Sequence, residues 1–124
     1  MSILAEGSGA GAVPWLMLAG AVGAVLRLAC DRWLPRRGIL LANVAGSLAA
    51  GLVIGIEPAG PSVTIWVTGL AGALTTFSTV SAYTAEEVRH GRWRAAVGSW
   101  ALHLGSGGLA VVLGLVAGAA LSAP

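Results

Sequence analysis

Four long apolar runs, separated by short polar stretches, dominate the chain. The runs cover about residues 11–33, 38–56, 63–83 and 95–121. A helix that crosses a bilayer needs about 20 mostly apolar residues, and each run is close to that length. Pro35, Pro58 and Pro61 stand in the first two connections, where residues that interrupt a helix are expected. The pattern predicts an all-α integral membrane protein in which residues 1–124 form a single domain with four transmembrane helices.

The third run differs from the others because hydroxyl side chains gather in its second half. They follow the interior glycines Gly69 and Gly72 and comprise Thr75, Thr76, Ser78, Thr79, Ser81 and Thr84. A bilayer tolerates polar or broken helix only where the backbone is buried in protein or lines a wet cavity. We therefore expect the third helix to be broken near Gly72–Thr75, where freed carbonyl groups could hold a cation beside a polar path.

Composition supports a membrane protein and argues against an enzyme. The chain is 56% hydrophobic and 10% charged, with a mean hydropathy of +0.86, whereas an ordinary globular domain is about 25% charged. The acidic residues lie near the ends of the runs and in loops, so no buried carboxylate pair is available for acid–base catalysis. The single cysteine, Cys30, excludes an internal disulfide and a Cys-based zinc site.

The arginines indicate how the chain is oriented. The first and third connections hold Arg32, Arg36, Arg37, Arg89, Arg92 and Arg94. The termini and the second connection carry only the acidic residues Glu6 and Glu57. We expect the chain to span the plasma membrane. The positive-inside rule then places the first and third connections in the cytoplasm. We interpret the arginines as topology signals and expect no nucleic-acid partner.

One arginine, Arg27, lies inside a run. It precedes Trp33 by six residues, roughly 9 Å along a helix. Its side chain either extends to the cytoplasmic interface or stays inside, where it could draw an anion into a vestibule. Both interpretations remain open from the sequence.

A few neutral polar residues lie within the other runs. Asn43 either lines a path or makes an interhelical hydrogen bond, because a buried amide needs partners. Ser99, His103 and Gly107 share one helix face at four-residue spacing. His103 is either a polar group at the edge of a pore or a proton relay. Neutral donors can replace the water around a small anion without trapping it, as conduction requires.

Small residues recur four positions apart, as in Gly51 with Gly55 and Gly114 with Gly118. This spacing predicts helices whose backbones approach closely. A bundle of four thin helices has little room for a pore of its own, so we expect an oligomer.

Three segments, in order and within a chain of this size, resemble the Fluc (CrcB) fluoride channels. They are residues 20–27 (GAVGAVLR), 41–47 (LANVAGS) and 69–79 (GLAGALTTFST). The resemblance covers nearly the whole chain, and its specific core is Gly-x-x-Thr-Thr-Phe-Ser-Thr. It implies a fluoride-selective channel that lowers cytoplasmic fluoride by passive efflux and assembles as an antiparallel dimer with two pores.

The resemblance also implies roles for individual residues. Backbone carbonyls of Gly72 and Thr75 would hold a central sodium ion that is structural and not transported. Asn43 would line the pore. Phe77 would present ring edges, which carry partial positive charge, to fluoride. Thr79 and Ser81 would lie along or near that path.

Two departures from the family pattern lead to a hypothesis about the partner. Val80 stands where the family usually has a second phenylalanine, and a family tyrosine and serine fall on Ser99 and His103. The arginine bias fixes one orientation, whereas a homodimer that inserts both ways needs a weak bias. The chain is therefore expected to pair with a paralogue of opposite orientation.

Two alternatives remain beside the channel. A small four-span proton-coupled exporter would need a carboxylate embedded in the membrane, and the nearest candidate, Asp31, lies at a helix end. The other alternative is a non-conducting partner subunit of a heterodimeric fluoride channel.

Overall fold

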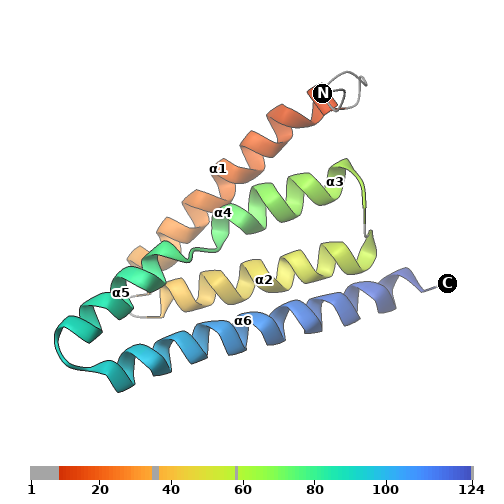
Figure 1. Cartoon of the computed structure of the whole chain (residues 1–124). Helices are drawn as coiled ribbons and strands as arrows, with labels where there is room; N and C mark the ends of the chain where they lie inside the picture. Colours follow the sequence, from red (N-terminus) through yellow and green to blue (C-terminus); the bar gives the residue numbers. More distant parts are fainter. Residues whose placement is uncertain (1–8, 35–36, 58, 124) are drawn as a thin grey trace, which may run out of the picture.

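The computed structural model describes residues 9–34, 37–57 and 59–123 (Figure 1). Over these residues the chain is helical, in the order α1 (Gly9–Trp33), α2 (Gly38–Ile56), α3 (Pro61–Val63), η1 (Thr64–Ala71), α4 (Gly72–Leu74), α5 (Ser78–Arg89) and α6 (Trp93–Ser122). Four helical units in the described part are long and apolar enough to cross a membrane, and the third comprises α3, η1, α4 and α5. The prediction of an all-α protein with four spans and an interrupted third helix is confirmed.

The third unit is longer than its apolar run. It spans Pro61–Arg89, whereas the expected range was 63–83, and α6 extends beyond 95–121 to Trp93–Ser122. The polar turn at the end of α5 stays helical, and in it Arg89 lies one turn after Glu86 with their side chains 3.5 Å apart. Apolar content alone does not register these charged helix ends.

The connections lie at two opposite ends of the bundle (Figure 1). The α1–α2 and α5–α6 connections share one end, and the α2–α3 connection shares the other with the start of α1 and the end of α6. Arg32 and Arg37 flank the α1–α2 connection, and Arg92 lies at the end of the α5–α6 connection. Arg36 and Glu6, also used in the orientation argument, lie outside the described residues.

Glycines bring α2 and α6 into backbone contact. A Cβ added to Gly51 would lie 2.2 Å from the Val111 carbonyl oxygen, and one added to Gly114 would lie 2.4 Å from that of Leu48. Gly55 and Gly118 continue the same seam one turn further on, with 2.5 and 2.4 Å to backbone oxygens of the facing helix. The close packing predicted from the four-residue spacing is confirmed for these glycines.

The first helix, α1, packs on η1, in the half of the third unit that precedes the break. A Cβ on Gly23 would meet the Leu70 carbonyl oxygen at 2.4 Å, so α1 touches the backbone of η1 directly. Elsewhere on α1, Trp15, Met17 and Leu28 are exposed. Large apolar side chains exposed in such numbers fit a surface that faces lipid or another membrane helix.

Candidate functional site

The break in the third unit lies between α4 and α5. Thr75 leaves the helix with extended backbone angles, φ −81° and ψ 153°. Its amide and its hydroxyl both donate to the Ala71 carbonyl at 3.0 Å, and the hydroxyl also approaches the Gly72 carbonyl at 3.4 Å. Thr75 thus closes the end of α4 with its own side chain, and the chain resumes as a helix only at Ser78.

Asn43 of α2 pairs with the peptide groups that the break releases. The Thr76 amide donates to Asn43 Oδ1 at 2.7 Å, and Asn43 Nδ2 donates to the Thr76 carbonyl at 3.2 Å. Buried backbone groups need such partners, and Thr76 is 8% exposed. The interhelical hydrogen bond considered for Asn43 is therefore present, and one amide satisfies both groups of a single residue.

A cluster of hydroxyl groups starts α5. The Thr76 hydroxyl lies 3.3 Å from that of Ser78 and 3.2 Å from that of Thr79, and it accepts from the Thr79 amide at 3.4 Å. The first amides of a helix have no partner within the helix. The Thr76 hydroxyl is such a partner for the Thr79 amide. The backbone of Thr76 thus bonds to Asn43, and its side chain accepts a hydrogen bond at the start of α5.

An aromatic pair lies beside the break. Phe77 is 71% exposed, and its ring meets that of Trp100 in an edge-on arrangement with centroids 5.0 Å apart and planes at 64°. Trp100 Nε1 donates to the Thr84 hydroxyl at 3.0 Å, and that hydroxyl reaches the Val80 carbonyl at 2.8 Å. These bonds fix α5 to α6 below the break.

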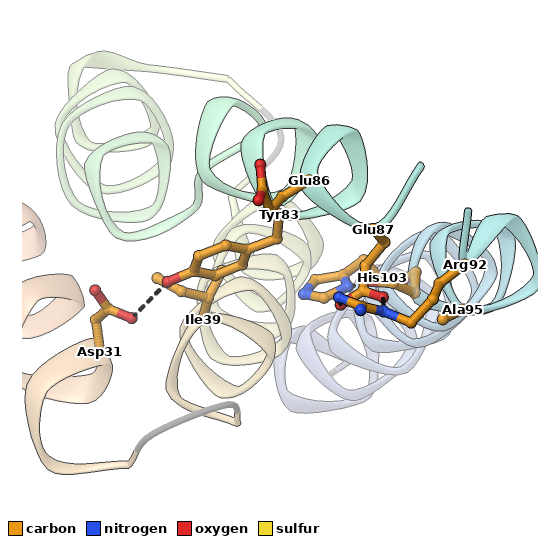
Figure 2. Close-up of a pocket in the computed structure, with 9 residues that line it drawn as sticks. Asp31, Ile39, Tyr83, Glu86, Glu87, Arg92, Ala95 and His103 are labelled. Carbon is orange, nitrogen blue, oxygen red and sulfur yellow. Dashed lines mark hydrogen bonds and ion pairs between the residues drawn. The ribbon is translucent and has the colours of Figure 1, made fainter. Parts of the chain in front are cut away.

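Two cavities lie along the bundle and share one residue. The break-site groove, of about 440 Å³, is lined mainly by α2, the break and α6: Asn43, Ser47, Thr75, Thr76, Phe77, Val80, Trp100, His103, Leu104, Gly107, Gly108 and Val111. The loop-end cavity, of about 860 Å³, is lined by Asp31, Ile39, Tyr83, Glu86, Glu87, Arg92, Ala95, Ser99 and His103 (Figure 2). Because His103 lines both, the ring stands at their junction.

The loop-end cavity is the charged one. Tyr83 donates to Asp31 across it at 3.4 Å, as Figure 2 shows. Arg92 binds Glu87 through Nε and, at 3.2 Å, through Nη2. The hydrogen bond from Arg92 to the Glu87 carboxylate raises the pKa of the guanidinium. The break-site groove, by contrast, has no Asp, Glu or Arg among its described lining residues.

Five of the nine predicted site residues line a cavity, and four do not. Asn43, Thr75, Phe77 and His103 meet in the break-site groove, and Ser99 lines the loop-end cavity. Arg27, Gly72, Thr79 and Ser81 are not among the described residues that line either cavity. Arg27 is half-buried on α1.

Sequence reasoning missed Trp100 and Tyr83 as parts of the site. Trp100 follows Ser99 and lies among apolar residues, so nothing in the local pattern separates it from a lipid-facing tryptophan. Tyr83 stands at the end of the third apolar run, and its hydroxyl donates to Asp31 of α1. The near four-residue spacing of Trp100 with His103 and Gly107 was the available signal.

These features define a small membrane protein with four helical units, an interrupted third unit and a polar groove beside the interruption. The family model described as CrcB-like protein, Camphor Resistance (CrcB), matches residues 14–115. The chain belongs to this CrcB family.

Relatives named as channels match most of the chain. A "Fluoride-specific ion channel FluC" from Bordetella petrii is 38% identical, over 88% of this chain and 95% of that protein. "Fluoride-specific ion channel FluC 2" from Natronomonas pharaonis is 42% identical over 82% and 90%, and the FluC from Deinococcus radiodurans is 40% identical over 86% and 94%. These relatives are named ion channels and not enzymes, in agreement with the absence of a catalytic constellation expected from the sequence.

Proposed function

We propose that the chain is a subunit of a fluoride channel. Passive efflux of fluoride through this channel would lower the cytoplasmic fluoride concentration. The observation that supports this most directly is the meeting of Asn43, Phe77 and His103, from three helical units, in a groove with no charged residue among its described lining. Its relatives named as fluoride-specific channels point the same way.

Fluoride would pass the break along neutral donors and ring edges. The hydrogen atoms at the edge of an aromatic ring carry partial positive charge, and Phe77 leaves most of its ring exposed at the groove. Hydroxyls of Thr79 and Ser81 would lie near this path outside the groove itself. Binding by neutral groups is weak enough for release, as a channel needs.

The residues at the break fit a structural sodium ion. The Thr76 amide donates to Asn43 Oδ1 and not to the carbonyl four residues earlier, and the Gly72 carbonyl receives a long contact of 3.4 Å from the Thr75 hydroxyl. Carbonyl oxygens at a broken helix are ligands that suit a hard cation. Gly72 and Thr75 would therefore hold the sodium through backbone oxygens. Sodium there would neutralise the partial charge of these carbonyls and stabilise the break.

The assembly is proposed to be an antiparallel dimer. One chain leaves Phe77 mostly exposed, which fits a ring that faces a second subunit as well as the groove. With the arginine-rich connections in the cytoplasm, the partner would be a paralogue inserted the other way. It would supply the second aromatic that Val80, 3% exposed at the groove, does not.

Fluoride efflux from liposomes tests the channel proposal. The chain is reconstituted alone and with a candidate paralogue, and efflux is followed with a fluoride electrode without a pH gradient. We expect efflux from the pair, and loss of most of it in Phe77→Ala but not in Leu109→Ala, a similarly exposed apolar residue. Unchanged efflux in Phe77→Ala would refute the pore assignment. Efflux that requires a pH gradient would favour the exporter.

Two further outcomes decide the heterodimer. Robust efflux from the chain alone would refute an obligate paralogue. A reporter of membrane topology should place the α1–α2 connection in the cytoplasm in nearly all copies. Equal insertion in both directions would refute the orientation argument.

A further inference from the structure

The His103 ring is held so that one nitrogen has no partner. His103 Nδ1 lies 2.9 Å from the Ser99 carbonyl oxygen. A carbonyl can only accept, so Nδ1 carries the proton. In the neutral ring Nε2 is then a bare acceptor. It is buried and has no hydrogen-bond partner among the described residues.

The residue that carries this buried nitrogen lies between the two cavities. His103 lines both the break-site groove and the loop-end cavity. Buried polar atoms without a partner are rare in folded proteins and point to a ligand, a water or a proton. If the ring takes a second proton, Nε2–H becomes a donor, and His103 becomes the one cation among the described residues that line the groove.

We propose that protonated His103 is an anion-binding site between the two cavities, where Nε2–H donates to fluoride in transit. The inference rests on the proposed channel function and adds a dependence on protons. In the neutral ring Nε2 carries a lone pair and cannot donate to fluoride. Protonation of the ring provides a charge-assisted hydrogen bond, the stronger kind.

The carboxylates near His103 repel an anion, so a positive charge on the His103 ring would offset part of that repulsion. Asp31 of α1 and Glu86 and Glu87 of α5 line the loop-end cavity with Arg92, and Tyr83 is the other titratable group there. Arg92 binds Glu87, and Arg89 and His90 approach Glu86. On α2, the lining residues Ile39, Asn43 and Ser47 do not titrate. Three carboxylates and one guanidinium thus line the loop-end cavity, and an anion that passes them is stabilised by a cation at His103.

The chain offers a matched control. His90 Nδ1 also lies 2.9 Å from the carbonyl four residues earlier, that of Glu86. However, His90 is exposed and lines neither cavity. Substitution of His90 removes the same ring with the same local bond from a position that lines neither cavity, and it also removes the 3.3 Å contact with the Glu86 carboxylate.

Fluoride efflux is measured between about pH 8 and pH 5.5, the range in which histidines titrate. Equal pH is kept on both sides of the membrane, and protein-free liposomes correct for the passage of HF. We expect efflux through the wild type and His90→Gln to rise about tenfold as the pH falls, and efflux through His103→Gln to stay constant. An equal rise in His103→Gln, or none in the wild type, would overturn the proposal.

A binding measurement decides the case even if a variant fails to fold or the chain conducts nothing. In ¹⁵N NMR of the wild-type protein, with His90→Gln used for assignment, fluoride should shift the His103 Nε2 resonance at about pH 5.5 and leave it unchanged at about pH 8. No shift at the lower pH would reject the anion site. A shift without efflux at any pH would instead refute the channel function and keep the site.

Discussion

Along α2, the half that contacts α6 and the half that contacts the break use different interactions. Gly51 and Gly55 meet the α6 backbone directly, with no side chain between the two helices. Two turns earlier, Asn43 makes two hydrogen bonds to a peptide of the broken unit. The first region is held by shape and the second by polar pairing.

The comparison shows how one helix serves both a scaffold and a site. Without a hydrophobic drive between helices in lipid, close contact and hydrogen bonds are the available forces. The glycine seam has no room for change, whereas the break exposes polar groups that an ion can use. Substitutions at the two regions should therefore differ in kind: the seam should lose the fold, and the break should lose function first.

The largest effect is expected at the seam. Gly114→Leu places a side chain against the Leu48 carbonyl, which a Cβ would already meet at 2.4 Å. Overpacking against backbone should cost more than about 3 kcal/mol, and the protein should elute as aggregate in detergent size-exclusion chromatography. Ala117→Leu, on an exposed position of the same helix, should elute normally. Normal elution of Gly114→Leu would show that the seam can open.

The next effect is expected at Asn43. Asn43→Leu keeps the volume but leaves the Thr76 amide and carbonyl without partners. The loss should be about 2–3 kcal/mol, seen as a lower thermal midpoint together with nearly complete loss of efflux. Ser47→Ala, which alters the same groove one turn further along α2, is the control and should shift the midpoint little. Full efflux in Asn43→Leu would show that conduction does not require the two hydrogen bonds between Asn43 and Thr76.

A smaller effect is expected below the break. Thr84→Val removes the acceptor of Trp100 Nε1, in a residue only 5% exposed. The cost should be about 1–2 kcal/mol, with a partial loss of efflux because Trp100 positions the Phe77 ring. Thr68→Val, at an exposed position of η1, should change neither quantity. A larger stability loss than that of Asn43→Leu would reverse the ranking.

The smallest effect is expected at the exposed pair of Glu87 and Arg92. Exposed ion pairs contribute little to stability because water and salt screen them. Arg92→Gln should leave the thermal midpoint unchanged and lower efflux modestly at low salt, with no difference at high salt. A clear drop in the midpoint would mean that this pair supports the α5–α6 connection.

The sequence predicted the seam better than the break. Four apolar runs and glycines four apart are periodic signals, and they gave four helices with close contacts between Gly51 and α6. The interruption was also predictable, because hydroxyls and glycines gather there. Its polar partners were not, since the bonds of Asn43 to Thr76 and of Trp100 to Thr84 join residues far apart in sequence or on different helices. A one-dimensional pattern shows that a buried amide needs a partner, but not which one it finds.

Because the turns of η1 are wide, the position of the break depends on the number of residues in η1. The Gly72 amide donates to the Val67 carbonyl five residues earlier, so this segment contains more residues per turn than an α-helix of the same length. Each residue of an α-helix turns the chain by about 100°. Deletion of one residue between Thr64 and Ala71 could therefore restore regular winding and turn Thr76 away from Asn43. The direction in which Thr76 faces therefore depends on the number of residues in η1 as well as on their identity. Insertions and deletions in this segment would be less tolerated than substitutions within it.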